Sequence, residues 1–122
     1  MIEHVRREIW LKATDLLVPV YAMTSRFPKD ELQSQINQLR AATVGIVVSL
    51  AEGFGAESEI DVERFIKSSL RAAHDCVAGL EVVRRLGLCP AHEAEDLIAH
   101  AQEIVGMLTG MVNNPGNPAQ SL

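Results

Sequence analysis

The sequence is poor in aromatic residues and cysteine, and it has no long apolar run. Aromatic side chains make up 4% of a chain that is 48% hydrophobic, so its core must be built mainly from Ala, Val, Leu and Ile. The two cysteines, Cys76 and Cys89, fit neither a disulfide framework nor a paired metal motif. The uncharged, mostly apolar run at residues 41–51 is far shorter than the ~20 residues that span a bilayer. We therefore expect a single cytoplasmic domain that does not enter a membrane, and the charged N-terminus is unlike a signal peptide.

Positive charge is missing from the last third of the chain. No Lys or Arg follows Arg85, whereas four carboxylates do, and the formal net charge is -5. Broad electrostatic binding of nucleic acid needs a clustered positive surface that neutralises phosphates. The charge balance therefore argues against that class of function.

Apolar residues recur at spacings of three and four along four segments, which predicts four helices and no strand. These segments cover about residues 3–26, 28–53, 58–87 and 90–112. We expect Pro19 to kink the first helix, Gly53 to end the second as a left-handed cap, and Ser58 to cap the third. The fold class predicted is all-α, an up-down-up-down antiparallel four-helix bundle over residues 1–113. The Asn-, Pro- and Gly-rich residues 114–122 are expected to be a disordered tail.

The stretch "SLAEGFG", residues 49–55, sets Glu52 against two glycines at the end of the uncharged run. It is no dinucleotide or phosphate loop, because no strand precedes it, the third glycine is missing and no Gly-Lys-Ser/Thr follows. A carboxylate at the C-terminal end of a helix meets the negative end of the helix dipole. We therefore predict that Glu52 is buried and paired, either with turn amides or with a cation. The candidate cations are Arg40, Arg64 and Lys67.

A metal site is conceivable on the fourth segment, where His92, Asp96 and His100 follow one another at intervals of four residues. This spacing puts the three side chains on one helix face, as metal ligands require. That face lies roughly 130° from the apolar stripe, so a solvated polar face is the favoured interpretation and a metal-binding helical bundle is the alternative. No nucleophile elbow is present, and His74, Asp75 and Cys76 are neighbours that cannot face each other on a helix. We predict no enzymatic activity, metal or cofactor.

The second segment has no charged residue between positions 41 and 51. A helix that packs on one side only should show a polar face over three turns, so this one needs a second cover. The bent first helix or another subunit could supply it, and we favour another subunit because extended apolar patches normally mark interfaces. The interface candidates are Val44, Val47 and Val48.

A short basic stripe lies on the third segment, where Arg64, Lys67 and Arg71 are spaced by three and four residues. Such a stripe could contact RNA phosphates. Carboxylates are interspersed with it, so ordinary surface ion pairing is the favoured interpretation.

The order of these features resembles the four-helix bundle proteins that are encoded by intervening sequences within bacterial 23S ribosomal RNA genes. The resemblance covers about residues 8–113, and its most specific part is Ala-Glu-Gly-x-Gly at residues 51–55. The matches in the first helix are Trp10, Ala13, Leu16, Tyr21, Thr24, Phe27 and Pro28. Those in the second are Arg40, Ala41, Ala42, Ile46, Ala51, Glu52, Gly53 and Gly55. Leu39, Gly45 and Ser49 depart from the pattern and thin out the polar groups that the family places there.

This resemblance implies a cytoplasmic, non-enzymatic bundle that self-associates as a ring-like homopentamer and serves as a binding or scaffolding module. RNA or a ribonucleoprotein is the partner that the family implies. A more distant relative, the accessory protein of diversity-generating retroelements, binds nucleic acid and a reverse transcriptase. The signature residues Arg40, Ala51, Glu52, Gly53 and Gly55 are implied to fix the geometry of the bundle.

Overall fold

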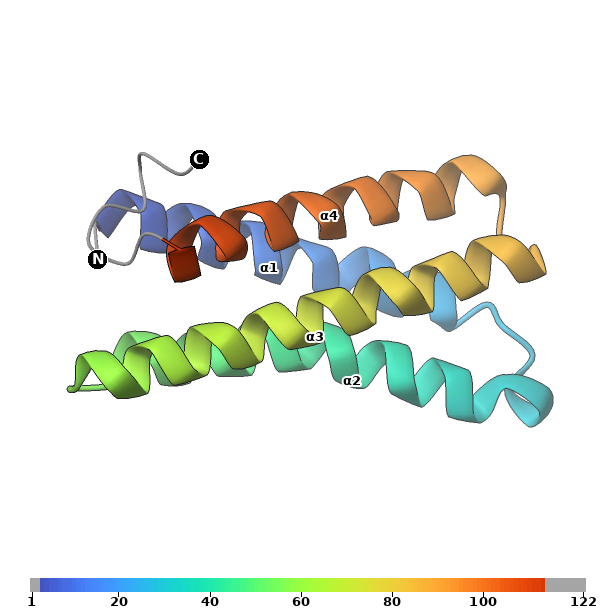
Figure 1. Cartoon of the computed structure of the whole chain (residues 1–122). Helices are drawn as coiled ribbons and strands as arrows, with labels where there is room; N and C mark the ends of the chain where they lie inside the picture. The colour runs from blue at the N-terminus through green and yellow to red at the C-terminus, as the bar shows by residue number, and fades with distance from the viewer. Residues whose placement is uncertain (1–2, 114–122) are drawn as a thin grey trace.

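The computed structural model describes residues 3–113, which form four helices joined by short turns (Figure 1). The helices are α1 (Glu3–Thr24), α2 (Lys29–Gly55), α3 (Glu59–Leu86) and α4 (Ala91–Asn113). Successive helices run in opposite directions, and each packs against the next, with α4 closing the circle against α1 (Figure 1). This is the up-down-up-down four-helix bundle that the sequence predicts, and the described residues hold no strand. The predicted tail, residues 114–122, lies outside the described residues.

The two ends of α3 follow the local rules of helix capping. The Ser58 side chain accepts a hydrogen bond from the backbone N–H of Asp61 over 3.1 Å. At the other end Gly87 adopts the left-handed conformation with φ of 64°. The backbone N–H of Leu88 donates to the carbonyl of Val83 over 3.2 Å, which completes a Schellman-type end. The predicted start and end of the third helix are thus confirmed.

One other prediction about helix ends is wrong. Helix α2 does not stop at Gly53 but continues to Gly55, and Gly87 is the only glycine with positive φ among the described residues. The chain leaves α2 through an extended residue, Ala56, whose N–H donates to the carbonyl of Gly53 over 3.3 Å. No left-handed cap is therefore needed there. Pro19 lies inside α1, and the kink expected there stays a prediction.

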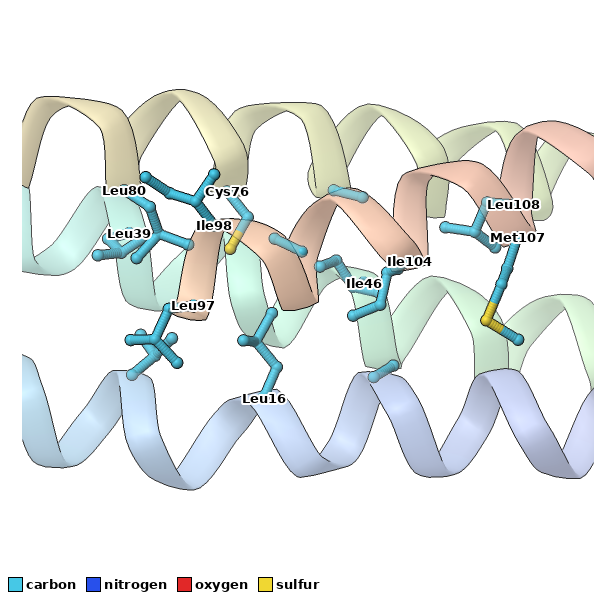
Figure 2. Close-up of a cluster of buried hydrophobic side chains, with 14 of the residues drawn as sticks. Leu16, Leu39, Ile46, Cys76, Leu80, Leu97, Ile98, Ile104, Met107 and Leu108 are labelled. Carbon is cyan, nitrogen blue, oxygen red and sulfur yellow. The ribbon is translucent and has the colours of Figure 1, made fainter. Parts of the chain in front are cut away.

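The core runs along the bundle axis and receives side chains from all four helices. Figure 2 shows a section of it, in which Leu80 of α3 lies beside Leu39 of α2, and Ile104 of α4 lies beside Ile46 of α2. Leu80, Ile46 and Ile104 have no exposed surface. Burying a large aliphatic side chain is worth about 1.5–3 kcal/mol, so this core is a main source of stability.

Three buried hydroxyls or thiols lie where α2 meets α3, and each is matched with a neighbour. The Ser69 hydroxyl of α3 donates to the carbonyl of Ile46 in α2 over 2.8 Å. The Thr43 hydroxyl donates to the Leu39 carbonyl over 2.8 Å and lies 3.5 Å from the Cys76 sulfur. The contact between α2 and α3 is the most extensive in the bundle, and these bonds fix its register.

The described helices also bear on the membrane prediction. None of them combines the length and the apolar character that crossing a bilayer requires.

Candidate interaction surfaces

The outer face of α2 is apolar and faces solvent in the single chain. Val44 is 37% exposed and Val48 is 47% exposed, and Ala41 and Ala51 are exposed beside them. Val47 is half-buried and packs against the core. Two of the three interface candidates therefore lie on the open surface, and the third, Val47, lies at its edge.

Helix α1 adds larger apolar side chains next to this face. Six of the nine large hydrophobic side chains that are exposed in the described part of the chain lie on α1 and α2. They are Trp10, Leu11, Val18, Tyr21, Val44 and Val48, which we call the α1/α2 apolar surface. Single exposed hydrophobic side chains are ordinary, whereas six on two neighbouring helices make this surface the strongest interface candidate in the described part of the chain.

Two cation–π contacts show how the flanks of α1 and α2 meet. The Arg6 guanidinium of α1 lies 5.1 Å from the centre of the Phe54 ring in α2. At the other end, the Arg40 guanidinium of α2 lies 4.5 Å from the centre of the Tyr21 ring in α1. Trp10 lies one turn beyond Arg6 on the same flank of α1. Trp10 and Tyr21 therefore both border the contact between α1 and α2. The exposed apolar residues of the two helices thus belong to one surface.

The family-signature residue Arg40 joins the end of α1 to α2. Its Nε donates to the Thr24 hydroxyl over 2.8 Å, and its Nη2 donates to the Tyr21 carbonyl over 3.3 Å. Thr24 is buried, and the last turn of α1 has no basic residue of its own. A cation near the last carbonyls of a helix complements the negative end of its dipole. Arg40 therefore adds a cation from α2 to the C-terminal end of α1, where Arg26 Nη1 also donates to the Ala22 carbonyl over 3.5 Å.

The prediction that Glu52 is buried and paired is wrong. Glu52 is exposed, and it makes no ion pair or side-chain hydrogen bond with any other residue of the range 3–113. Arg40 lies twelve residues away on the same helix, which is about 18 Å. The other two candidate cations are engaged within α3, Arg64 with Asp61 over 3.2 Å and Lys67 with Glu63 over 3.0 Å. Because α2 continues to Gly55, Glu52 lies on the outer side of an intact turn, where water solvates it.

The buried residue of the signature is Gly53. A Cβ atom placed on Gly53 would lie 3.2 Å from the Cβ of Phe65 and 3.4 Å from the Cδ1 of Ile66, both in α3. At Gly55 the corresponding space is open, with nothing within 4 Å. Gly53 therefore permits the close approach of α2 to the start of α3. The signature does contribute to bundle geometry, but through Gly53 and Arg40.

The basic residues Arg64, Lys67 and Arg71 meet around one hollow of about 510 Å³ on the outer face of α3. All three are exposed. Two of them are engaged in ion pairs within their own helix, whereas Arg71 makes none with the described residues. The structure thus groups the three residues, and it leaves the charge of Arg71 available.

The structure does not group His92, Asp96 and His100 as metal ligands. His92 and Asp96 are exposed on α4, whereas His100 Nε2 lies 2.8 Å from the backbone carbonyl of Lys12. A carbonyl only accepts, so Nε2 carries the proton and donates. Within residues 3–113 no cluster of three or more His, Cys, Asp or Glu side chains is placed to hold a metal ion.

Sequence reasoning did not assign Leu11 and Val18 to a surface. Both are strongly exposed, at 51% and 76%. The signal was present in their spacing, because residues 11 and 18 lie seven apart on the side of the helix opposite Ile9 and Leu16. Two apolar residues repeated on the outer face of an otherwise amphipathic helix make that face a candidate interaction surface.

The fold places the chain among small all-helical proteins of the four-helix bundle class. The chain belongs to the 23S rRNA-intervening sequence protein family, whose model matches residues 6–110. The match spans all four helices and confirms the resemblance drawn from the signature residues. None of the curated proteins compared with the chain matches it.

Proposed function

We propose that this protein is a non-catalytic scaffolding module that assembles with copies of itself through the α1/α2 apolar surface. The observation that carries the proposal is the position of Trp10, Leu11, Val18, Tyr21, Val44 and Val48 on two adjacent helices. Exposing such a surface to water is unfavourable. Each square ångström of apolar area that association removes from water contributes about 25 cal/mol to the binding free energy. A second copy of the chain is always present at the same concentration and offers a matching cover. The family resemblance implies a ring-like homopentamer as the assembled form, in the cytoplasm.

The test of this proposal introduces a charge on the exposed face of α2. Val48→Glu removes no core contact, because Val48 is 47% exposed, so the helices should stay intact. The matched control is Ala99→Glu, which adds the same charge on the exposed side of α4. We expect sedimentation velocity to show assembled wild-type and Ala99→Glu chains, and a dissociated Val48→Glu chain with unchanged helical circular dichroism. Equal sedimentation of all three chains contradicts the proposed surface.

The basic residues of α3 favour a second proposal, that the module contacts the backbone of RNA. Support comes from Arg64, Lys67 and Arg71 around one hollow, and from the Phe65 ring that lies 4.4 Å beneath the Arg64 guanidinium. Because the net charge of the chain is -5, binding of RNA would depend on the local positive charge of Arg64, Lys67 and Arg71. The partner would be ribosomal RNA or a ribonucleoprotein, as the family implies.

RNA contact is tested by a gel shift in which salt is titrated, with a fragment of 23S ribosomal RNA and an unrelated RNA of equal length. Arg71→Glu should weaken binding and lower the salt slope by roughly one, because one phosphate contact is lost. Lys29→Glu, an equally exposed cation at the start of α2, should leave binding unchanged. Absence of any shift at low salt refutes this second proposal and leaves self-association untouched.

A further inference from the structure

A cavity of about 450 Å³ lies at the end of the bundle where α1 begins and α4 ends. The turn between α2 and α3 reaches the same end of the molecule (Figure 1). Ile66 and Met111 line the cavity and are buried, and Val62 and Val112 beside them are half-buried. We call this space the end cavity. Its volume falls in the range of pockets that hold ligands, about 300–1,000 Å³, so an occupant with apolar groups would fit.

The end cavity also contains a hydrogen-bond donor without an acceptor. Arg6 of α1 lines the cavity, and its Nε is buried and has no hydrogen-bond partner among residues 3–113. The guanidinium lies over the Phe54 ring, which can contact its face but cannot accept from Nε in the guanidinium plane. Buried donors in native proteins are nearly always paired. An occupant of the end cavity should therefore bring an acceptor for Arg6.

Carboxylates surround the mouth of the end cavity. Glu57, Glu59 and Glu63 line it and are exposed. Glu63 pairs with Lys67 over 3.0 Å, whereas Glu57 and Glu59 make no ion pair within residues 3–113. Like charges repel, so an anionic occupant is disfavoured. The acceptor for Arg6 should therefore be an uncharged group, and a backbone carbonyl meets that requirement.

The chain itself continues from the wall of the end cavity. Val112 lines the cavity, and α4 ends one residue later at Asn113. The segment that follows, residues 114–122, contains no Lys, Arg, Asp or Glu, and it includes Pro115 and Pro118. Stretches with proline favour the polyproline II conformation, whose carbonyls are free to accept, and they extend by about 3.1 Å per residue. The segment is therefore long enough to cross the cavity and carries the acceptors that Arg6 lacks.

We infer that residues 114–122 fold back over the end cavity of their own chain, where a backbone carbonyl accepts from Arg6 Nε. The apolar residues of the segment cover Ile66 and Met111 at the open end of the core. Because the segment is tethered at Asn113, its effective concentration at the cavity is on the order of millimolar, which allows weak contacts to hold it. Its composition predicts no fixed structure for the segment by itself, and the cavity supplies the contacts that it lacks.

The test measures how far the segment protects a thiol in the wall of the end cavity. Val62→Cys places that thiol, in a chain of residues 1–122 that also carries Cys89→Ser. The segment is then made acidic by three changes of almost equal size, Asn114→Asp, Asn117→Asp and Gln120→Glu. The carboxylates at the mouth should repel it. We expect a thiol reagent to label position 62 about tenfold faster, as when a covered state populated about ten to one is lost.

Matched variants assign this protection to the mouth and to the donor. Glu57→Lys with Glu59→Lys should restore slow labelling of the chain with the acidic segment, because the mouth then attracts it. Arg6→Met should speed labelling of the chain with the original segment, and the acidic changes should then add little. Arg7→Met, at an exposed neighbouring position, should have no effect. Ala99→Cys, used instead of the thiol at position 62, lies on the exposed side of α4 and should be labelled equally with either segment.

Three results would overturn the inference. Equal labelling at position 62 with the original and the acidic segment would mean that the segment leaves the cavity open. Failure of the two lysines to restore slow labelling would remove the segment from the mouth. Labelling that slows as the protein concentration rises would show that another chain provides the cover. The proposed self-association is judged separately by sedimentation, since the segment can cover the cavity in a monomer and in an assembly alike.

Discussion

Gly53 of α2 lies against Phe65 of α3 so closely that a Cβ atom on the glycine would be 3.2 Å from the Cβ of Phe65. That separation is shorter than ordinary van der Waals contact, and it involves a Cβ atom that the α3 backbone holds in place. The most recognisable stretch of the sequence, Ala-Glu-Gly-x-Gly, thus owes its first glycine to helix packing. Its glutamate faces water, and its second glycine, Gly55, has open space beside it.

Gly53→Ala is expected to destabilise the bundle although alanine favours helices. Replacing a helical glycine by alanine is worth about 1 kcal/mol. Overpacking of a tight contact costs about 1–3 kcal/mol, so the clash with Phe65 should outweigh the gain and leave a net loss of about 1 kcal/mol. Urea unfolding at a fixed protein concentration measures the difference, since the stability of an oligomer depends on concentration.

Gly55→Ala is the matched control within the same signature. No atom lies within 4 Å of the position that its Cβ would occupy, so the substitution should be neutral or slightly stabilising. If Gly53→Ala raised the urea midpoint as much as Gly55→Ala, the close approach of α2 to α3 at this site would be disproved.

Arg40→Ala is expected to lower the free energy of unfolding by about 1–3 kcal/mol, the range for hydrogen bonds that involve a charged group. The substitution removes the donor to the Thr24 hydroxyl and the Tyr21 carbonyl at the end of α1. Arg40→Lys should recover only part of the loss, because an ammonium cannot reach both acceptors as a planar fork does. Chemical denaturation of both variants gives the comparison, with Arg71→Ala as an exposed control that should be near neutral. Full recovery by lysine would show that charge alone suffices.

Local signals in the sequence determined much of the fold, and contacts between helices determined the rest. Ser58 and Gly87 were placed correctly because a cap depends on its own few neighbours. Gly53 and Glu52 were misplaced because the end of α2 depends on how tightly α3 packs against it. A single sequence does not give the distance between residues 53 and 65. A glycine that allows close helix packing therefore cannot be told from a glycine that ends a helix.

For the interface candidates too, local sequence predicted the apolar character, whereas packing between helices decides which side chains are exposed. The uncharged run of α2 correctly predicted an apolar outer face, on which Val44 and Val48 are exposed. It could not tell that Val47 leans on the core, because that depends on the angle at which α1 crosses α2. The role of Arg40 at the end of α1 was also out of reach, since its partners lie in another helix.

The stability of the bundle should fall at alkaline pH in a way that depends on Cys76. Burial raises the pKa of this thiol above its ordinary value of 9.0, and the hydrogen bond with Thr43 opposes the rise only in part. The unfolded thiol ionises first as the pH rises through 9.0, so the unfolded state binds fewer protons than the native one. The contribution is fully present below that pH and is lost above it, up to the raised native pKa. Urea unfolding from neutral to alkaline pH should show a steeper decline for the wild type than for Cys76→Ala.

Thiol labelling provides the control for that interpretation. Cys76 has no exposed surface, whereas Cys89 is half-buried. In the native protein Cys89 should react first with a thiol reagent, and Cys76 only when the bundle opens. Equal labelling rates in the Cys89→Ser and Cys76→Ala chains would place Cys76 at the surface and remove the basis of the pH prediction.

The most direct test of the account is the mass of the wild-type protein in solution, measured by size exclusion with light scattering across micromolar concentrations. The proposed self-association through the α1/α2 apolar surface predicts an assembly of several 13.3 kDa chains, five in the proposed homopentamer. A single species of 13.3 kDa at every concentration would contradict the account.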